Sequence, residues 1–281
     1  MIVEVGAGER WDDLVARAVA AGWAGIECLS GIPGDVGATP IQNVGAYGQD
    51  VAGAIVHVRT IERASGKIVE MGAAACGFGY RDSVFKREQK GLLVVTRVTF
   101  ALRPGGAPSL RYAELAKQLA GRESPSLSEV RATVLALRKS KSMLLDRDAE
   151  NGKSAGSFFM NPTLDAAQLA AASARVAASG VLRPGEVMPS YAANEGRTKL
   201  AAGWLIERAG FHKGFGDGRA GLSTKHALAV VNRGGATAAE IVAFARTVKD
   251  GVRDRFGVEL QAEPVLVGFS AEATAGLIAE P

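Results

Sequence analysis

The 281-residue sequence contains only two cysteines, three histidines and 6% aromatic residues, and it has no long apolar run. Cys28 and Cys76 are too few for a disulfide framework or a cysteine-rich zinc site, and the histidines lack the spacing of metal ligands. We therefore expect no metal, two buried thiols and a reducing, cytoplasmic setting. No stretch approaches the roughly 18 apolar residues of a membrane span, so neither a span nor a signal peptide is expected.

Charge of either sign is also not in large excess. The formal net charge is +4, and the basic residues are dispersed rather than gathered in blocks or interleaved with aromatic residues. This pattern predicts no nucleic-acid partner. A small positive charge suits an anionic small molecule such as a nucleotide.

Glycine, by contrast, is abundant: 35 of the 281 residues are glycine, a proportion above the usual share of about 7%. Residues 31–48 (GIPGDVGATPIQNVGAYG), here called the glycine-rich run, combine glycines with two prolines. Because a helix loses about 1 kcal/mol at each glycine and about 3 kcal/mol at each proline, the run is predicted to form loops and tight turns. Such a loop lets backbone N–H groups approach an anionic ligand closely. From composition alone, a surface connection that binds nothing is equally compatible with it.

Hydrophobic periodicity divides the sequence into a strand-rich and a helix-rich portion. In the first, residues 11–21 have the spacing of an amphipathic helix, and residues 54–61 and 91–102 are rich in β-branched residues, as strands are. Gly66-Lys67, between these strands, is typical of a hairpin tip. Residues 103–108 (RPGGAP) form the clearest break in composition and predict a linker.

The second portion is expected to contain mainly helices. Ser126 and Glu129 have the spacing of a capping box. Thr237 and Glu240 have it too, and they are expected to open the longest helix. The other expected elements are a helix capped by Thr163 and running to Gly180, a helix over 200–209, and short strands over 227–231 and 265–267.

Four segments together resemble the UDP-N-acetylenolpyruvoylglucosamine reductases, and they occur in the family's order: 31–48, 79–85 (GYRDSVF), 156–162 (GSFFMNP) and 260–264 (LQAEP). The first is similar to the family's flavin-contacting loop. The resemblance extends from the first residues to about Gly268. It implies an α+β fold, with the C-terminal part of a vanillyl-alcohol-oxidase/PCMH-type FAD-binding domain over residues 1–108. An α+β domain that binds a UDP-sugar substrate is then expected over residues 109–281.

The resemblance implies an FAD-dependent oxidoreductase that uses NADPH to convert UDP-N-acetylglucosamine enolpyruvate to UDP-N-acetylmuramate in peptidoglycan synthesis. Hydride goes to C3 of the enolpyruvyl group, and C2 receives a proton. Because negative charge on C2 spreads into the neighbouring carboxylate, the protein has to supply a cation or donors there and a proton for C2. The implied cofactors are FAD and NADPH. The implied partner is a UDP-sugar, with no nucleic acid and no membrane.

Three residues carry over from the family as catalytic. Arg81 is expected to bind the carboxylate through its fork of donors, and the alternative is a surface arginine paired with Asp82. Ser157 is expected to donate the proton to C2, since no Gly-x-Ser-x-Gly elbow marks it as a nucleophile. Glu263 is expected to be protonated or to share a proton beside the enolate, and the alternative is an exposed glutamate that ends a strand.

The resemblance also assigns binding residues. Those for FAD lie in the glycine-rich run and are Gly34, Gly37, Ala38, Thr39, Gln42, Asn43, Gly45, Ala46 and Tyr47. Those for the substrate are Tyr112, Lys141 and Asn161, with Lys139 as an alternative to Lys141. Phe158 and Phe159 are expected in the core rather than against the cofactor.

The sequence begins at a point that corresponds to the inside of the family's flavin domain. Residues 1–8 (MIVEVGAG) correspond to an inner strand, and in the family a further glycine-rich loop that helps to hold the FAD pyrophosphate precedes it. Two alternatives are therefore open: a working reductase, or a flavin-free remnant that at most binds a UDP-sugar. The full family fold is expected to be a monomer, whereas a shortened chain is expected to be prone to self-association through exposed strand edges.

Overall fold

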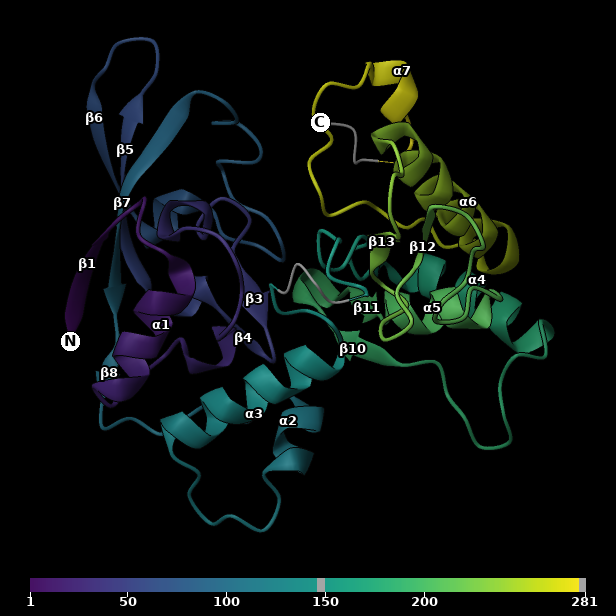
Figure 1. The fold of residues 1–281 in the computed structure, drawn as a ribbon, viewed down its shortest axis with the longest axis horizontal. Helices are drawn as coiled ribbons and strands as arrows, with labels where there is room; N and C mark the ends of the chain where they lie inside the picture. The colour runs from purple at the N-terminus through teal and green to yellow at the C-terminus, as the bar shows by residue number, and fades with distance from the viewer. Residues whose placement is uncertain (146–149, 278–281) are drawn as a thin grey trace. The chain divides into compact units, whose positions relative to one another are not determined.

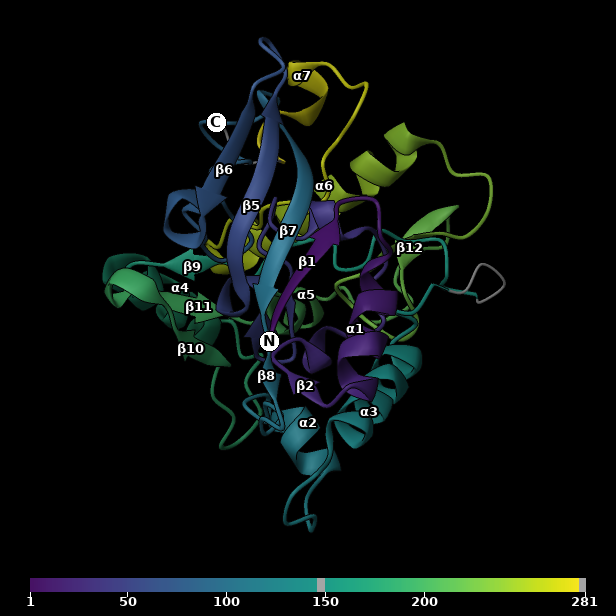
Figure 2. The same cartoon turned by 90° about the vertical axis from the view of Figure 1, so that its left-hand side faces the viewer.

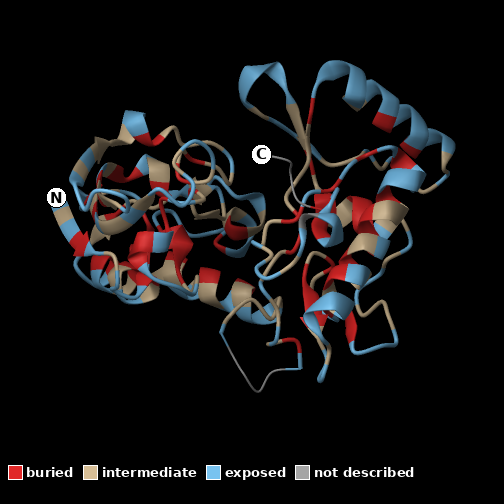
Figure 3. Ribbon diagram, turned by 90° about the horizontal axis from the view of Figure 1, so that it is seen from above, coloured by how far each residue is buried: buried red, intermediate tan, exposed pale blue. Residues whose placement is uncertain are grey.

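The computed structural model describes residues 1–145 and 150–277, which belong to two compact units, Met1–Ser140 and Lys141–Pro281 (Figure 1). Each unit has its own hydrophobic core. Figure 3 shows the buried residues inside each unit and the exposed residues on its outer turns. Both units combine helices with antiparallel strands, which confirms the α+β class.

The first unit is built on a four-stranded antiparallel sheet in the order β1-β7-β5-β6, whose strands lie side by side in Figure 2. Its strands are β1 (Ile2–Gly6), β5 (Ile55–Glu62), β6 (Ile68–Gly72) and β7 (Leu93–Ala101). Strands β5 and β7 confirm the predicted strands. The predicted hairpin tip is also confirmed, with Gly66 at φ +72°, but it leads into β6, a short strand that the sequence pattern does not predict.

Helix α1 (Trp11–Ala20) confirms the predicted amphipathic helix. Trp11 and Val15 are buried in the same core as the sheet, and the Trp11 ring lies 5.9 Å from that of Phe100 in β7. The indole N–H of Trp11 donates to the carbonyl of Leu29 at 3.0 Å. The helix is thereby fixed both to the sheet and to the chain that leads into the glycine-rich run.

Between α1 and β5 the chain forms turns and very short elements, as predicted for the glycine-rich run. They are β2 (Trp23–Ala24), β3 (Gly45–Ala46), β4 (Gln49–Asp50) and the 3-10 turns η1 (Glu27–Leu29), η2 (Val36–Ala38) and η3 (Val51–Gly53). Strands β3 and β4 pair as a small hairpin. A further turn, η4 (Ala73–Cys76), follows β6.

The residues that follow the sheet also pack on the first unit. Strand β8 (Arg103–Pro104), inside the predicted linker, pairs with β2. Helices α2 (Ala113–Gln118) and α3 (Leu127–Ser140) share a small core with Cys28, so the compact units divide after Ser140. The division after residue 108 separates an FAD-binding from a substrate-binding region, and as a functional division it stays a prediction.

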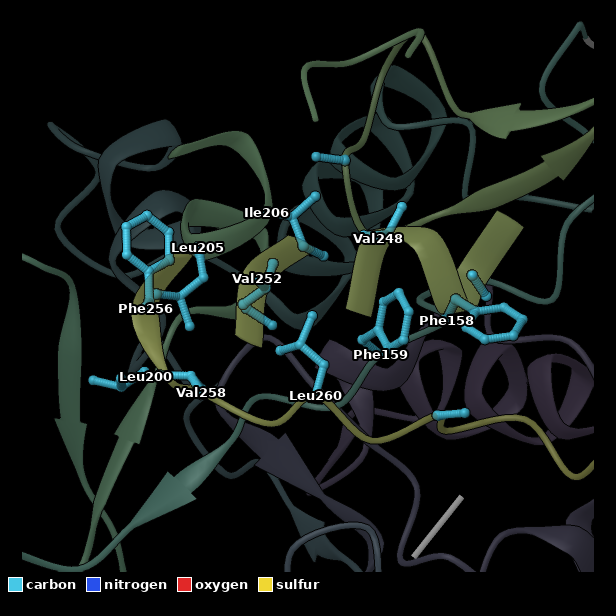
Figure 4. Packing of buried hydrophobic residues seen from close by; sticks show 14 of the residues in the cluster. Phe158, Phe159, Leu200, Leu205, Ile206, Val248, Val252, Phe256, Val258 and Leu260 are labelled. Atoms are coloured by element: carbon cyan, nitrogen blue, oxygen red, sulfur yellow. The ribbon is translucent and has the colours of Figure 1, made fainter. Parts of the chain in front are cut away.

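The second unit contains a three-stranded antiparallel sheet, β10-β11-β9, and a β12–β13 hairpin. Its elements are β9 (Thr163–Leu164), α4 (Ala166–Ala178), β10 (Ser190–Ala192), η5 (Asn194–Gly196), β11 (Thr198–Leu200), α5 (Ala202–Arg208), β12 (Ala220–Leu222), β13 (Val230–Asn232), α6 (Ala238–Phe256) and α7 (Ala271–Thr274). The capping box of Thr237 and Glu240 opens α6 as predicted. Figure 4 shows the core, in which Val248 and Val252 of α6 pack near Phe159 and Leu260.

The cap of α4 differs from the prediction. The Asp165 carboxylate accepts the N–H of Gln168 at 2.8 Å, whereas Thr163 pairs with Lys199 in the sheet. Thr163 is two residues too early because the backbone is still extended there. The other capping box of the sequence, Ser126 with Glu129, opens α3 as predicted.

Two other segments of the second unit also differ from their predictions. The helix expected over 200–209 begins at Ala202, because Leu200 still belongs to β11. Residues 265–267 form no strand, and Val265 and Val267 are largely exposed. Apolar β-branched residues alone do not make a strand where no neighbouring strand offers a ladder.

Within residues 1–145 and 150–277, no helix combines the length and the apolar character that crossing a bilayer requires. The same residues include no group of three or more histidine, cysteine or carboxylate side chains placed to hold a metal ion. Cys28 and Cys76 are buried free thiols, as predicted, and burial raises the pKa of Cys28 to about 12 and that of Cys76 to about 11.

Candidate functional site

The glycine-rich run is held against the residues that follow β1. The Gly37 N–H donates to the carbonyl of Ala7 and the Val36 N–H to that of Glu9, both at 2.9 Å. A Cβ on Gly37 would lie 2.5 Å from the Ala7 Cβ, so no side chain fits there without displacing one of the two segments. Glycine at position 37 is therefore explained by packing inside the unit.

An open hollow of about 440 Å³ lies beside this contact. It is lined by Ala7, Gly8, Asp35, Gly37, Ala38, Ile41, Leu93, Val94 and Val95. Most of these side chains are small or apolar, and a Cβ on Gly8 or on Gly34, which adjoins Asp35, would meet no atom within 4 Å. The volume is in the range of small-molecule sites, so the hollow fits part of a bulky cofactor such as a dinucleotide.

Two predicted cofactor residues of the run make internal hydrogen bonds. Thr39 is buried, and its hydroxyl donates to the carbonyl of Val36 at 2.8 Å. Asn43 is buried with φ +46°, and its side-chain oxygen accepts the N–H of Ala52 at 3.0 Å. These contacts fix the course of the run, so both residues shape the loop that exposes Ala38.

The β3–β4 hairpin contains the last predicted cofactor residues. Its two turn residues, Tyr47 and Gly48, have φ values of +49° and +75°, as a two-residue type I′ turn requires. A Cβ on Gly45 would lie 3.0 to 3.1 Å from the Asp50 Cβ, from a backbone oxygen and from the Arg81 guanidinium. Glycine at position 45 therefore allows Arg81 to approach the hairpin.

Tyr47 and Tyr112, predicted to contact cofactor and substrate respectively, touch each other. Their rings pack edge to face, with centroids 5.3 Å apart at 89°. Burial raises the pKa of the Tyr47 hydroxyl to about 12, so this group stays protonated at neutral pH. Tyr112 is the N-cap residue of α2 and is exposed. Gln42, at the other end of this stretch, is half-buried.

The Arg81 segment docks on the glycine-rich run through three side chains. Asn43 donates to the carbonyl of Gly79 at 2.8 Å, the Arg81 guanidinium donates to the carbonyl of Gly45 at 2.7 Å, and Ser83 donates to the carbonyl of Ile41. These bonds join two of the four segments that carry the family resemblance. The structure thus places Arg81 beside the predicted cofactor loop.

Arg81 itself has an unusual backbone conformation. Its φ of +56° lies in the left-handed region, which costs energy for a residue with a Cβ. Lys86 donates to the Arg81 carbonyl at 2.9 Å, and the guanidinium carbon lies 5.4 Å from the centre of the Tyr80 ring. The neighbouring Asp82 carboxylate forms an ion pair with Arg87. Strain of this kind is typical of side chains whose direction matters for function.

Ser157 and Glu263 lie on neighbouring segments of the second unit. The Glu263 N–H donates to the carbonyl of Phe158 at 2.8 Å, and the N–H of Phe158 donates to the carbonyl of Leu228 at 2.7 Å. Phe159 pairs with Ala262 in an antiparallel bridge. Ser157 lies two residues before Phe159 and directly after Gly156, whose φ is +79°. Both Ser157 and Glu263 are half-buried. The structure therefore places these two predicted catalytic residues on two backbone segments that pair with each other.

The remaining predicted residues have mainly structural surroundings. Phe158 and Phe159 are buried in the core with ring centroids 5.2 Å apart, as predicted. The side-chain oxygen of Asn161 accepts the N–H of Ala202 at 2.9 Å and so caps the start of α5. Lys141, directly after α3, is half-buried, whereas its alternative Lys139 is exposed.

Arg81 and the predicted cofactor residues belong to the first unit, and Ser157 and Glu263 belong to the second. Each group is assembled inside its own unit by the hydrogen bonds described above. A single site that contains all three catalytic residues stays a prediction.

Sequence reasoning missed Glu27, a buried carboxylate in the turn η1, shortly before the glycine-rich run. Its two oxygens accept the N–H of Gly25 at 2.7 Å, the N–H of Ser109 at 2.8 Å and the side-chain amide of Gln49 at 3.2 Å. Glu27 thereby joins the chain before the run, the β3–β4 hairpin and the chain that leads to Tyr112. The available signal was a single carboxylate between the apolar residues Ile26 and Cys28.

Comparison with known protein families gives two matches in sequence order. Residues 1–72 match the family described as "FAD binding domain", and residues 147–267 match "UDP-N-acetylenolpyruvoylglucosamine reductase, C-terminal domain". The first match contains strands β1, β5 and β6 and most of the residues that line the hollow. The Ser157 and Glu263 segments lie within the second.

Two curated relatives match nearly the whole chain. The UDP-N-acetylenolpyruvoylglucosamine reductase of Thermobifida fusca (strain YX) is 51% identical over 95% of this chain and 75% of the relative. That of Nocardia farcinica (strain IFM 10152) is 53% identical over 93% of this chain and 68% of the relative. Among solved structures, the UDP-N-acetylenolpyruvylglucosamine reductase of Thermus caldophilus matches with a TM-score of 0.58 and 26% identity, over 92% of this chain and 70% of that one.

Proposed function

Because the chain belongs to the UDP-N-acetylenolpyruvoylglucosamine reductase family, we propose that it reduces the enolpyruvyl ether of UDP-N-acetylglucosamine to UDP-N-acetylmuramate. It is an FAD-dependent oxidoreductase of peptidoglycan synthesis, with NADPH as the reductant. The observation that carries this proposal is the 51% identity to the Thermobifida fusca relative over 95% of the chain.

The residues of the first unit fit FAD. The open hollow and the small side chains of the glycine-rich run provide room for the cofactor. We assign its binding to Gly34, Gly37, Ala38, Thr39, Gln42, Asn43, Gly45, Ala46 and Tyr47, with Thr39 and Asn43 acting by shaping the loop. Held by these residues, FAD would supply the hydride transfer from NADPH to C3 of the enolpyruvyl group.

Arg81 is the proposed partner of the enolpyruvyl carboxylate. Its guanidinium is held next to the cofactor loop by the carbonyl of Gly45. A guanidinium stays charged at every working pH, and its donors match the two oxygens of a carboxylate. Arg81 therefore orients the substrate and stabilises the charge that spreads from C2 into the carboxylate as hydride adds to C3.

Ser157 is the proposed proton donor. The two electrons that NADPH supplies reach C3 as a hydride, and the proton that completes the reduction is added to C2 from the Ser157 hydroxyl. The serine then recovers a proton from solvent. A serine is a weak acid, but a carbanionic C2 is basic enough to accept its proton, and glycine at position 156 leaves room for a close approach.

Glu263 is proposed to act in its protonated or proton-sharing form. An ionised carboxylate beside an enolate-like charge would repel it, so the reaction itself calls for a carboxyl group that carries or shares a proton. Its backbone pairing with Phe158 keeps it next to the serine segment.

The UDP-sugar is proposed to contact Tyr112, Lys141 and Asn161. An ammonium group suits a diphosphate, and the contact of Tyr112 with Tyr47 places it beside the cofactor loop. We further propose that residues 1–108 mainly bind FAD and residues 109–281 mainly bind the substrate. The free thiols Cys28 and Cys76 support a cytoplasmic location. The proposed role of the enzyme there is cell-wall synthesis during growth and division. A monomer is the proposed state.

A visible spectrum tests the proposal. The protein is incubated with FAD and desalted, and we expect a retained flavin band that NADPH bleaches and the enolpyruvyl substrate restores. A colourless protein that still binds a UDP-sugar would contradict the proposal and favour the flavin-free alternative.

The role of Ser157 is tested by Ser157→Ala in the flavin-loaded enzyme. We expect restoration of the flavin band by the substrate to slow by roughly 100-fold or more, while bleaching by NADPH stays within about twofold. Ser173→Ala, at an exposed position of α4, is the control and leaves both rates near those of the unchanged enzyme. Equal losses in the two half-reactions of Ser157→Ala would exclude the proton-donor role.

A further inference from the structure

Residues 268–277 lie beyond the matched C-terminal domain, which ends at residue 267, yet they fold back onto the second unit. Leu277 has no exposed surface and belongs to the core of the unit. Ser270 caps the short helix α7, with its hydroxyl oxygen accepting the N–H of Ala273 at 3.2 Å. Residues 268–277 are thus a packed part of the unit that contains Ser157 and Glu263.

Arg246 of α6 fastens this returning segment. Its two terminal guanidinium nitrogens donate to the carbonyls of Ala273 at 3.0 Å and Ala275 at 2.9 Å. The last carbonyls of a helix lack partners within the helix, so a guanidinium placed there satisfies them and fixes the helix end. Arg246 therefore connects the longest helix of the unit with the stretch that ends at Leu277.

The same stretch reaches the backbone next to Glu263. The Ala262 N–H donates to the carbonyl of Leu277 at 2.9 Å, while the Glu263 N–H donates to the carbonyl of Phe158 at 2.8 Å. Successive N–H groups of an extended chain point to opposite sides. The stretch that bears Glu263 is therefore held from both edges, by the serine segment on one side and by Leu277 on the other.

We infer that the segment Ser270–Leu277 positions Glu263 for the proton chemistry of the reaction, with Leu277 and Arg246 as positioning residues. This inference rests on the proposed function, in which Glu263 faces the substrate. Without the Leu277 carbonyl, the backbone that bears Glu263 is fixed on one side only. A displacement of about 1 Å in a reacting group costs on the order of 100-fold in rate, so the second tie matters for catalysis.

Two substitutions in the full-length, flavin-loaded enzyme test the inference. Leu277→Ala removes the buried anchor, and Arg246→Gln removes the clamp from a partly exposed position that leaves the core intact. For both, we expect at least about tenfold faster amide hydrogen exchange at Ala262. The substrate half-reaction slows by about tenfold, while NADPH still bleaches the flavin within about twofold of the normal rate.

Three comparisons separate positioning from general destabilisation. Arg246→Lys retains a cationic donor and restores most of the rate, whereas Arg255→Gln, on the exposed side of α6, changes neither exchange nor rate. In a Glu263→Gln background, Leu277→Ala adds no further loss, because its effect passes through Glu263. An additive loss in that background would overturn the inference. If Leu277→Ala fails to fold, Arg246→Gln decides the question alone.

The outcomes also separate this inference from the proposed function. If Glu263→Gln leaves the substrate half-reaction unchanged, the catalytic assignment of Glu263 is wrong. If Glu263→Gln slows that half-reaction while Arg246→Gln and Leu277→Ala leave it unchanged, Glu263 keeps its role and the positioning by the C-terminal segment is rejected.

Discussion

At the scale of single residues, glycine stands at the positions of the glycine-rich run for different physical reasons. Gly37 and Gly45 are glycines because another part of the chain occupies the space of a Cβ. Gly34 is required by its φ of +112°, and both Gly34 and Gly8, on the facing segment, border open space. Composition predicts a loop from all of them alike. Only the packed structure separates the internal glycines from those that face outward.

Gly37→Ala is expected to destabilise the first unit by about 1 to 3 kcal/mol, because the new Cβ would lie 2.5 Å from that of Ala7. Thermal unfolding measures the loss, and a gel-filtration assay of retained flavin shows whether the displaced run still holds FAD. We expect both to decrease. Gly53→Ala is the control, since a Cβ there meets no atom within 4 Å and its φ is not positive. Equal effects of the two substitutions would refute the packing explanation.

At the scale of elements, one ion pair connects α1, the glycine-rich run and α3. Both oxygens of Asp12 accept from the Arg131 guanidinium, at 2.7 and 2.8 Å, and the N–H of Gly31 donates to the same carboxylate at 2.6 Å. The hydrogen bond from Arg131 is the main cause of the lowered pKa of Asp12. This pair explains why α3, which lies after the predicted linker, packs with the first unit.

The lowered pKa gives the pair a definite pH dependence. Because folding depresses the pKa of Asp12, its contribution is present above the unfolded value of 3.8 and is lost as the pH falls through the folded value. Asp12→Asn should therefore cost about 1 to 2 kcal/mol at neutral pH, an estimate reduced for partial solvent exposure, and progressively less below pH 3.8. Urea unfolding at several pH values measures this, with the exposed neighbour Asp13→Asn as the control. A cost that does not change with pH would contradict the assignment.

Local patterns predicted elements well and long-range contacts poorly. The capping boxes of α3 and α6 could be found in the sequence because both partners lie within three residues. Thr163 failed as a cap because pairing with Lys199, 36 residues away, keeps it extended. The contacts of Glu27 with Ser109, and of Asn43 with Gly79, likewise join residues far apart in sequence, so no local spacing reveals them. The sequence alone pointed to the segments of the candidate site, whereas the hydrogen bonds between those segments could be seen only in the structure.

At the scale of the whole molecule, the proposed functional residues are divided between two units with separate cores. The sheet of the first unit packs on α1 around Val98 and Phe100, and the second unit packs on α6 around Val252 and Phe256. The proposed FAD residues belong to the first unit, and the proposed proton donor belongs to the second. Stability in one unit can therefore change without a direct change in the ligand contacts of the other.

A substitution in each core tests this separation. Phe256→Leu removes part of a fully buried ring and should cost about 1 to 2 kcal/mol, which lowers the unfolding midpoint of the second unit by roughly 4 °C or more. The temperature at which bound flavin is released, followed by its fluorescence, should stay unchanged, because the proposed FAD residues all lie in the first unit. Val98→Ala, at an equally buried position of the first unit, should lower the flavin-release temperature. If both substitutions shift calorimetric unfolding and flavin release by the same amount, the two units unfold as one cooperative body, and the assignment of flavin binding to a separately stable first unit is wrong.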